Sequence, residues 1–498
     1  MNNSPTQTSL KSQITSGVMW CGFGRVAQQV VQFGLSVLLA RLLSPDDFGL
    51  IAMMMVFTGF AGMLADGGFN TALVQKQGMT DAHVYTVFWI TLVSGFLLAA
   101  MTFLLGSTLA SFYEAPALEP IFKVISVNFI LSSFGNVPSA LLQKRMAFKK
   151  IAAINNWALF VSGTVAVVMA LCGAGVWSLV VQSIVSSLVL ASLRIWSCRW
   201  VPRFIFSPQA LREIWGFSGH MFGFLFINYW ARNADNLIIG KFFGSTALGF
   251  YNRAYALMLL PLTQFNAIIN QVMLPALSKI QDDKPLARSL YLKTTGIVSL
   301  LASPLMFGLF VVADPFILTV YGEKWGDVAP ILQILALVGW MQSLTSSVGL
   351  LLQSQGRSDR LFYWWSLFYA MFIVSFFVGV MIGTVYAVAV CYAVANLLYI
   401  YPAMSICGRA VDLKAFEIMK AASGPVFAAL GMGAVVYAVK WWLPAAWPTG
   451  LQLALLILTG MFVYLSIVIL AKLAAWQDLW EFIRRKKQKT SLTSECLG

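Results

Sequence analysis

Residues 228–251 read NYWARNADNLIIGKFFGSTALGFY, and the stretch begins inside a long apolar run. It nevertheless carries Arg232, Asp235 and three asparagines. A charged side chain at the centre of a membrane helix costs about 2.5–3.5 kcal/mol on insertion scales, so such residues usually face a bundle interior or a water-filled cavity. Because Arg232 and Asp235 are three residues apart, we expect them to share a helix face and to pair. The stretch is therefore the first candidate site.

A counterpart of this stretch lies 200 residues earlier in the chain. Residues 38–50, LLARLLSPDDFGL, align with residues 238–250, IIGKFFGSTALGF, so that Gly49 falls on Gly249. Further matches at the same shift are Gln28 with Asn228, Gln32 with Arg232, Arg41 with Lys241, Ser44 with Gly244, Asp66 with Asn266 and Asn70 with Asn270. Such self-similarity predicts that the chain contains two copies of one structural unit.

The composition indicates a helical membrane protein. Hydrophobic residues make up 59% of the chain and charged residues 10%. Apolar runs of about 18 residues or more recur along the whole length, and each can cross a hydrocarbon core of about 30 Å. The fold class that this predicts is an all-α polytopic membrane protein. We place fourteen spans at roughly 15–39, 48–73, 84–110, 118–142, 151–171, 176–196, 214–240, 247–275, 292–313, 328–353, 362–382, 386–408, 420–440 and 449–471.

The distribution of positive charge predicts the orientation. With the amino terminus inside, the inner segments hold 25 of the 33 Lys and Arg residues, whereas the outer loops hold five. By the positive-inside rule both termini lie in the cytoplasm. The net charge of +14 then reflects attraction to anionic lipid at the inner surface rather than binding of nucleic acid.

The repeat predicts how the chain is divided. Six spans separate equivalent elements, so the two copies share one membrane orientation, and a pathway is expected between them. The predicted parts are a cytoplasmic segment 1–14, a lobe of spans 1–6 at 15–200, a lobe of spans 7–12 at 201–410, spans 13 and 14 at 411–472, and a cytoplasmic amphipathic helix with a basic tail at 473–498.

Polar residues recur at helical spacing on corresponding spans of the two copies, which places them on one face of each helix. The candidate cavity residues are Arg25, Gln29, Gln32, Asn70, Asn228, Arg232, Arg253, Asn266 and Asn270. The candidates for ion coupling or gating are Asp66 and Asp235. The alternative is that these side chains only hydrogen-bond neighbouring helices, at about 0.6–2 kcal/mol each.

The sequence gives little support for a metal site, a catalytic base or a nucleotide-binding loop. The six cysteines form no CxxC pair and no cluster with histidine, so we expect free thiols and no metal site. Neither His83 nor His220 is placed like a catalytic base. A Walker A motif, which would cradle nucleotide phosphates, does not occur, so ATP-driven pumping by this chain is not expected.

Several motifs resemble the polysaccharide transporter family. They are the early SGxxW with LLARLLSPxDFG, the segment RNADNLIIGK, the segment LGFYNRAY and the segment YGEKW, starting at Ser16, Leu38, Arg232, Leu248 and Tyr321. The likeness covers about residues 12–420. The family belongs to the superfamily of multidrug, oligosaccharidyl-lipid and polysaccharide exporters, and the likeness is closest to its colanic-acid-exporter type.

The resemblance implies a non-enzymatic flippase of the bacterial inner membrane. Its substrate would be a sugar repeat unit linked to undecaprenyl diphosphate, moved by alternating access between the lobes, with no cofactor and with proton or sodium coupling left open. Expected partners are membrane lipids and the polymerase and chain-length machinery of polysaccharide assembly. The alternatives are a drug or small-solute antiporter of the same superfamily and, from another class, a membrane polymerase or glycosyltransferase.

Overall fold

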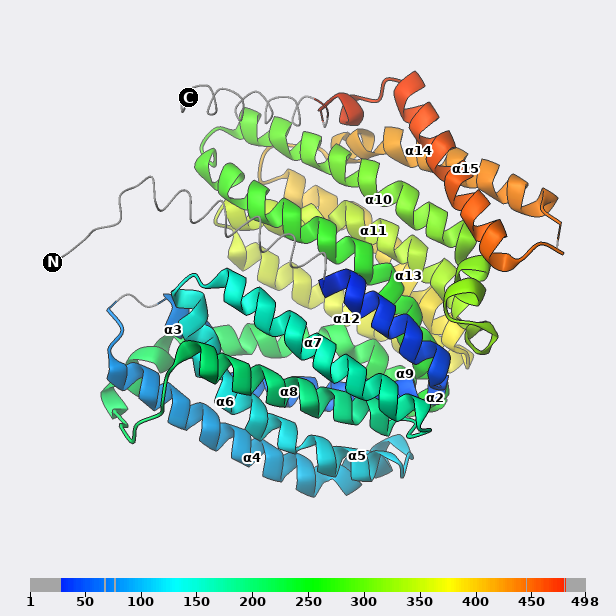
Figure 1. The fold of residues 1–498 in the computed structure, drawn as a ribbon. Helices are drawn as coiled ribbons and strands as arrows, with labels where there is room; N and C mark the ends of the chain where they lie inside the picture. Colours follow the sequence, from blue (N-terminus) through cyan, green and yellow to red (C-terminus); the bar gives the residue numbers. More distant parts are fainter. Residues whose placement is uncertain (1–27, 67–68, 76–77, 445, 479, 481–498) are drawn as a thin grey trace, which may run out of the picture. The chain divides into compact units, whose positions relative to one another are not determined.

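A computed structural model of the protein describes residues 28–66, 69–75, 78–444, 446–478 and Trp480 (Figure 1). Every regular element in these ranges is helical. Among the described residues, eleven helices are long and apolar enough to cross a membrane. The predicted all-α polytopic class is confirmed, and each of the fourteen predicted spans overlaps a helix.

The chain forms two compact units, residues 1–249 and 250–498. The first unit contains a helix over residues 28–42, α2 (Pro45–Asp66), α3 (Phe69–Gln75), α4 (Asp81–Tyr113), α5 (Leu118–Ile125), α6 (Val127–Lys144), α7 (Phe148–Leu171) and α8 (Trp177–Cys198). Helix α9 (Pro208–Lys279) begins in this unit and continues into the second. The second unit also contains α10 (Lys284–Val320), the 3-10 turn η1 (Glu323–Trp325), α11 (Val328–Ser354), α12 (Ser358–Ile382), α13 (Val385–Gly408), α14 (Ala415–Trp442) and α15 (Thr449–Leu470). The lobe boundary after residue 200 stays a prediction.

Helix α2 begins at Pro45 for reasons that are visible in the sequence. The Ser44 hydroxyl accepts a hydrogen bond from the Asp47 backbone N–H at 3.2 Å, and the Asp47 carboxylate accepts one from the Ser44 backbone N–H at 2.9 Å. This reciprocal pattern is a capping box. Pro45 takes the first helical position, where a backbone N–H would have no partner within the helix. The preceding helix therefore ends and α2 starts within a few residues.

Helix α9 is broken at the position that the repeat equates with Ser44. Gly244 has φ 80° and ψ −179°, a conformation that is open almost only to glycine. The predicted spans 214–240 and 247–275 lie on either side of this break. Both copies of the repeat thus consist of a helix, a break and a second helix, with the two breaks at matching places.

Substituting Gly244 tests this break. We expect Gly244→Ala to destabilise the protein by about 1–3 kcal/mol, because the alanine Cβ disfavours the positive φ. Gly34→Ala is the matched control, since Gly34 lies in the helix over residues 28–42 and a Cβ there meets no atom within 4 Å. Thermal unfolding in detergent measures both variants. An unchanged midpoint for Gly244→Ala would mean that the break is not needed.

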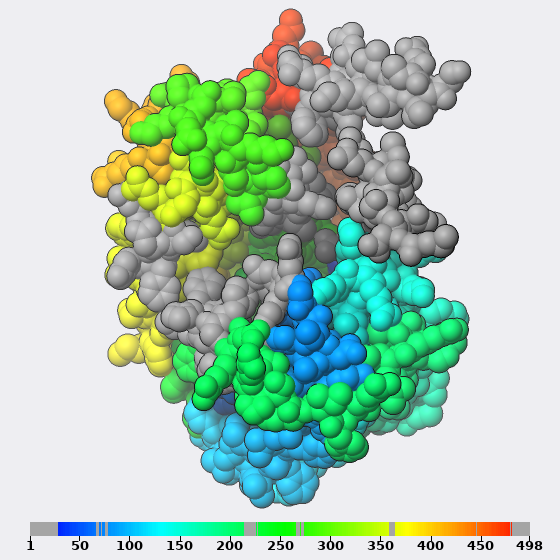
Figure 2. Space-filling model, turned by 90° about the vertical axis from the view of Figure 1, so that its left-hand side faces the viewer, coloured from blue at the N-terminus to red at the C-terminus, as the bar shows by residue number. Residues whose placement is uncertain are grey.

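In the first unit, α4, α6, α8 and α7 lie side by side in that order (Figure 1). Figure 2 shows the cyan segment of α7 beside the green segment of α8. Phe69, Leu73 and Phe88 form the centre of an apolar cluster between α3, α4 and α6. Burial of these side chains holds the short α3 against the longer helices.

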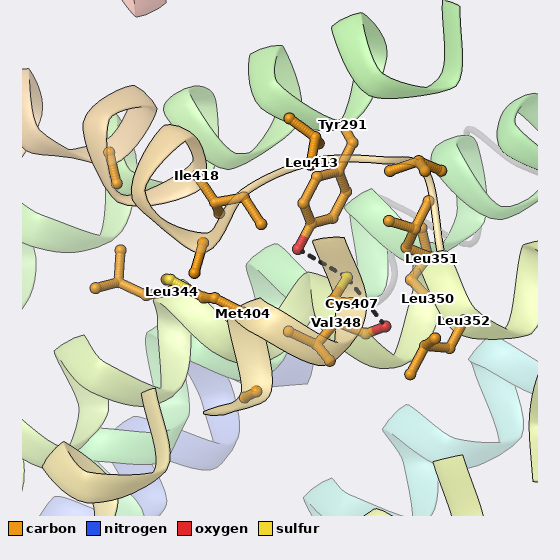
Figure 3. Close-up of a cluster of buried hydrophobic side chains, with 14 of the residues drawn as sticks. Tyr291, Leu344, Val348, Leu350, Leu351, Leu352, Met404, Cys407, Leu413 and Ile418 are labelled. Carbon is orange, nitrogen blue, oxygen red and sulfur yellow. Dashed lines mark hydrogen bonds between the residues drawn. The ribbon is translucent and has the colours of Figure 1, made fainter. Parts of the chain in front are cut away.

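In the second unit, α10 packs on α11 and α14, and α11 packs on α13. The buried Tyr291 on α10 connects three of these helices, because its hydroxyl accepts a hydrogen bond from Ser347 on α11 at 3.2 Å. The same hydroxyl lies 3.4 Å from the Cys407 sulfur on α13 (Figure 3). The surrounding side chains are aliphatic. A satisfied polar group inside such a cluster specifies one packing arrangement of the three helices.

The cysteines of the described residues are free thiols, as predicted. Cys198 and Cys407 are buried, Cys391 is half-buried and Cys172 is exposed. Cys21 and Cys496 lie outside the described residues.

The last two helices, α14 and α15, pack on α10 within the second unit. Lys440 on α14 pairs with Asp314 on α10 at 2.8 Å, and α15 packs on both helices. After α15, Leu473 and Trp476 pack against an apolar cluster formed by side chains of α10, α14 and α15, while Asp478 pairs with Lys293 at 2.7 Å. Leu473 and Trp476 of the predicted amphipathic segment therefore pack on the protein itself. The basic tail from residue 481 lies outside the described residues.

Candidate functional site

The first part of α9, which carries the candidate stretch, is held against α2 by an aromatic contact. The Tyr229 hydroxyl lies 3.1 Å from the Met55 carbonyl oxygen and 2.7 Å from that of Val56. A Cβ on Gly59 would lie 2.5 Å from the same hydroxyl. A phenol aimed at the backbone of a neighbouring helix fixes how α9 is rotated about its own axis. This rotation sets the directions in which the polar side chains after Tyr229 point.

Rings from both helices enlarge this contact. Phe57 meets Trp230 at a centroid distance of 6.1 Å, and Phe60 lies 5.1 Å from Trp230 and 5.4 Å from Phe226. The sequence analysis missed this cluster, although the signal was present as aromatic residues at helical spacing on both segments. Edge-to-face ring pairs contribute about 0.5–1.5 kcal/mol each beyond the area that they bury. The cluster therefore makes the start of the candidate stretch rigid.

Asp235 and Arg232 lie in different environments. Asp235 is only 3% exposed, and its carboxylate accepts a hydrogen bond from the Asn236 backbone N–H at 2.7 Å. Arg232 is exposed and takes part in no ion pair found among the described residues. The expected pairing along the helix is therefore not formed in this structure. Arg232 remains available for a ligand, whereas Asp235 belongs to the interior of the unit.

The other candidates are distributed unevenly. Gln29, Asn70 and Asn228 are half-buried and Gln32 is exposed, all in the first unit. In the second unit, the half-buried Arg253 lies against the Tyr321 hydroxyl at the end of α10. Arg25 and the side chains of Asp66, Asn266 and Asn270 lie outside the described residues. A shared cavity between the two stripes thus stays a prediction.

His83 is a buried histidine with hydrogen-bonding partners on two segments. Its Nδ1 lies 2.7 Å from the Thr80 hydroxyl at the start of α4, and its Nε2 lies 3.2 Å from the Glu213 carboxylate on α9. The residue therefore ties α4 to the first turns of α9. The side chain of His220 lies outside the described residues.

The opposite end of the first part of α9 is also tied to α4. Lys241 pairs with Glu114 at 2.6 Å and lies 5.5 Å from the centre of the Phe112 ring. The hydrogen bond and the charge of Lys241 lower the pKa of Glu114. Because Glu114 is largely exposed, the ion pair adds little to the free energy of unfolding, and its main effect is to fix the position of α9 beside the end of α4.

Comparison with known proteins identifies the family. Residues 38–330, more than half of the chain, match the model of a family described as "Polysaccharide biosynthesis protein". The chain belongs to this polysaccharide biosynthesis protein family. The matched range contains both copies of the repeat motif, the break at Gly244 and the candidate stretch. The resemblance inferred from the motifs is thereby confirmed.

Relatives in the family match over most of their length. The teichuronic acid biosynthesis protein TuaB of Bacillus subtilis is 26% identical, over 87% of this chain and 90% of its own. The succinoglycan biosynthesis transport protein ExoT of Rhizobium meliloti is 27% identical, over 98% of this chain and 99% of its own. Among solved structures, the lipid II flippase MurJ in an inward closed conformation has a TM-score of 0.73 and 14% identity, covering 91% of this chain and 99% of its own. At this identity the structural likeness shows a shared fold.

Proposed function

We propose that this protein is a flippase that translocates oligosaccharide repeat units linked to undecaprenyl diphosphate across the bacterial inner membrane. The observation that carries the proposal is that the chain belongs to a polysaccharide biosynthesis family while sharing the fold of a lipid II flippase over 91% of its length. The relative named as a succinoglycan biosynthesis transport protein supports export of a polysaccharide precursor. The polysaccharide can be an exopolysaccharide, a capsule or lipopolysaccharide.

The candidate stretch fits such a substrate. A diphosphate linked to sugars needs cations and hydrogen-bonding groups, whereas its polyprenyl tail can remain among lipid chains. Arg232 presents an exposed guanidinium, and a guanidinium can bind phosphate oxygens through two parallel hydrogen bonds. Asn228 and Gln32 add amides in the same unit. We assign Arg232 to the diphosphate and these amides to the sugar or the phosphate.

Asp235 has the features of a residue for ion coupling. Its carboxylate is buried, and buried ionisable groups within membrane helices are typical of proton and ion pathways. We therefore propose that a proton or sodium ion acts here. The polymerase and the chain-length machinery are proposed as the proteins that take up the translocated unit.

Deletion of the gene tests the proposed function. Loss of the flippase should abolish the polysaccharide and leave single lipid-linked repeat units on the cytoplasmic side of the membrane. A polymerase would instead leave these units on the outer side. A drug exporter would leave the polysaccharide at its normal level. Either of the last two results would refute the proposal.

The proposed orientation has both termini in the cytoplasm, on the strength of the basic inner segments. In a chain whose native cysteines have been replaced, single cysteines at Lys149, Arg203 or Arg357 should therefore be protected from a membrane-impermeant thiol reagent in intact cells. Cysteines replacing Asp46, Glu114 or Lys324 should be labelled. Opposite results at two or more of these positions would contradict the orientation.

A further inference from the structure

The second unit contains a cavity at the first turns of α10. Its volume is about 530 Å³, within the range of about 300–1,000 Å³ that is usual for small-molecule sites. The lining residues come from α10 and from the turn between α13 and α14, and they include Lys284, Arg288, Ser289, Leu292, Val411 and Asp412. All of them belong to one compact unit. The cavity shares no residue with the candidate stretch, so it is a second candidate site.

Two cations line the cavity, and a carboxylate holds each of them in place. Lys284 pairs with Asp412 at 2.9 Å, and Arg288 pairs with Glu417. Glu417 is itself held at the start of α14, where it accepts a hydrogen bond from the Lys414 backbone N–H at 2.9 Å. An ammonium has three N–H donors and a guanidinium has five, so each cation keeps donors that no described residue uses. These donors are available to an anion.

The rest of the cavity wall consists of a hydroxyl and apolar side chains. Ser289 is exposed, and its hydroxyl forms no hydrogen bond with any described residue. Val411 belongs to the aliphatic cluster around Tyr291 that Figure 3 shows, and Leu292 packs against this cluster. The floor of the cavity is therefore part of a packed core. Two cations and a hydroxyl above an apolar floor suit a phosphate that is carried by an apolar molecule.

The cavity lies at the depth of the lipid headgroups. The predicted span of α10 begins at residue 292 and that of α13 ends at residue 408, so the lining residues fall at or just outside the ends of both spans. Trp476 and Trp480 stack at 6.4 Å between ring centroids, and Asp478 between them pairs with Lys293, one turn after Ser289. Trp480 is 59% exposed, and tryptophan is enriched at the membrane–water interface. The proposed orientation places this interface on the cytoplasmic side.

We propose that this cavity binds the headgroup of an anionic phospholipid from the inner leaflet. Its phosphate lies between Lys284 and Arg288, which donate charge-assisted hydrogen bonds to the phosphate oxygens. Basic pockets at the cytoplasmic ends of membrane helices suit such headgroups. A zwitterionic headgroup fits less well, because its own cation would meet the two cations of the wall. The exposed Leu286 and Phe416, in the first turns of α10 and α14, offer apolar surface to the glycerol and the upper acyl chains.

Stability in the presence of added lipid tests the site. Full-length protein in detergent is titrated with phosphatidylglycerol or with phosphatidylcholine that has the same acyl chains, and the unfolding temperature is followed. A ligand that binds only the folded protein stabilises it by mass action, so phosphatidylglycerol should raise the midpoint more than phosphatidylcholine does. Arg288→Gln/Glu417→Gln should need about tenfold or more phosphatidylglycerol for the same rise, because the strongest hydrogen bonds to the phosphate are lost. The double change leaves no carboxylate of this ion pair behind, and a glutamine can still cap α14.

The matched control is Arg357→Gln, which removes an exposed cation just after α11 in the same unit. This variant should respond to phosphatidylglycerol as the parent chain does. A phosphatidylglycerol with a photoactivatable headgroup gives a second readout that needs no variant. Irradiation of vesicles that contain the parent chain should label peptides from residues 284–292 and 411–417.

The inference is overturned if the two phospholipids stabilise the parent chain equally, if the double variant responds like the parent, or if labelling is confined to other segments. An equal loss of response in Arg357→Gln would show a general effect of surface charge and would also overturn it. Glycerol phosphate that stabilises as well as phosphatidylglycerol at the same concentration would show a site for a soluble anion instead of a lipid. None of these results depends on export, so the inference and the proposed function fail separately.

Discussion

Replacing Arg232 by alanine is expected to reduce polysaccharide export about tenfold or more while the protein stays at its normal level in the membrane. The side chain is exposed and has no ion-pair partner among the described residues, so its removal leaves no buried charge unpaired. A hydrogen bond to a charged group contributes about 1.5–3 kcal/mol, which is the size of the expected loss. Arg232→Lys should restore part of the export, because a point cation still attracts phosphate although the fork geometry is lost.

The control is Arg212→Ala, an exposed arginine on the same helix, which should export normally. Asp235→Asn is expected to act differently, because this carboxylate is buried. The double variant Arg232→Ala/Asp235→Asn should export no better than Arg232→Ala. Restored export in the double variant would show that the two charges are a structural pair. Normal export by Arg232→Ala would remove Arg232 from the substrate site.

Replacing Trp325 by alanine is expected to destabilise the protein by about 3–5 kcal/mol, the range for a large aromatic side chain removed from a core. Trp325 is fully buried and packs against Phe250 at 6.2 Å and Tyr321 at 6.0 Å between ring centroids. Thermal unfolding in detergent measures the loss. Trp442→Ala is the control, since Trp442 is 84% exposed. Equal stability of the two variants would contradict the assigned packing.

The helices and the repeat were accessible from the sequence because both depend on local pattern. Apolar length predicts a membrane helix almost regardless of its neighbours. The residues Ser44 and Pro45 form a recognisable helix start, and the break at Gly244 lies between the predicted spans 214–240 and 247–275. The family resemblance followed from the same motifs and was confirmed over residues 38–330.

The relations between side chains were not accessible, because they depend on how each helix is rotated and on which helix lies beside it. Arg232 and Asp235 have the spacing of a pair, yet the Tyr229 contact with α2 fixes a rotation that buries one and exposes the other. The sequence also predicted that Gly49 and Gly249 are equivalent. It held no signal that Gly49 would lie against the Ser245 backbone and Gly249 against the Pro45 backbone, since equivalence in a repeat does not imply contact.

The most direct measurement is translocation by the purified protein in sealed proteoliposomes. The vesicles carry an undecaprenyl-diphosphate oligosaccharide with a fluorescent sugar that a membrane-impermeant reagent can quench. The account predicts that the quenchable fraction changes with time only in vesicles that contain the protein. The central claim is that this chain is a flippase. It would be contradicted if folded wild-type protein moved no more lipid-linked sugar than protein-free vesicles do, under either an imposed proton gradient or an imposed sodium gradient.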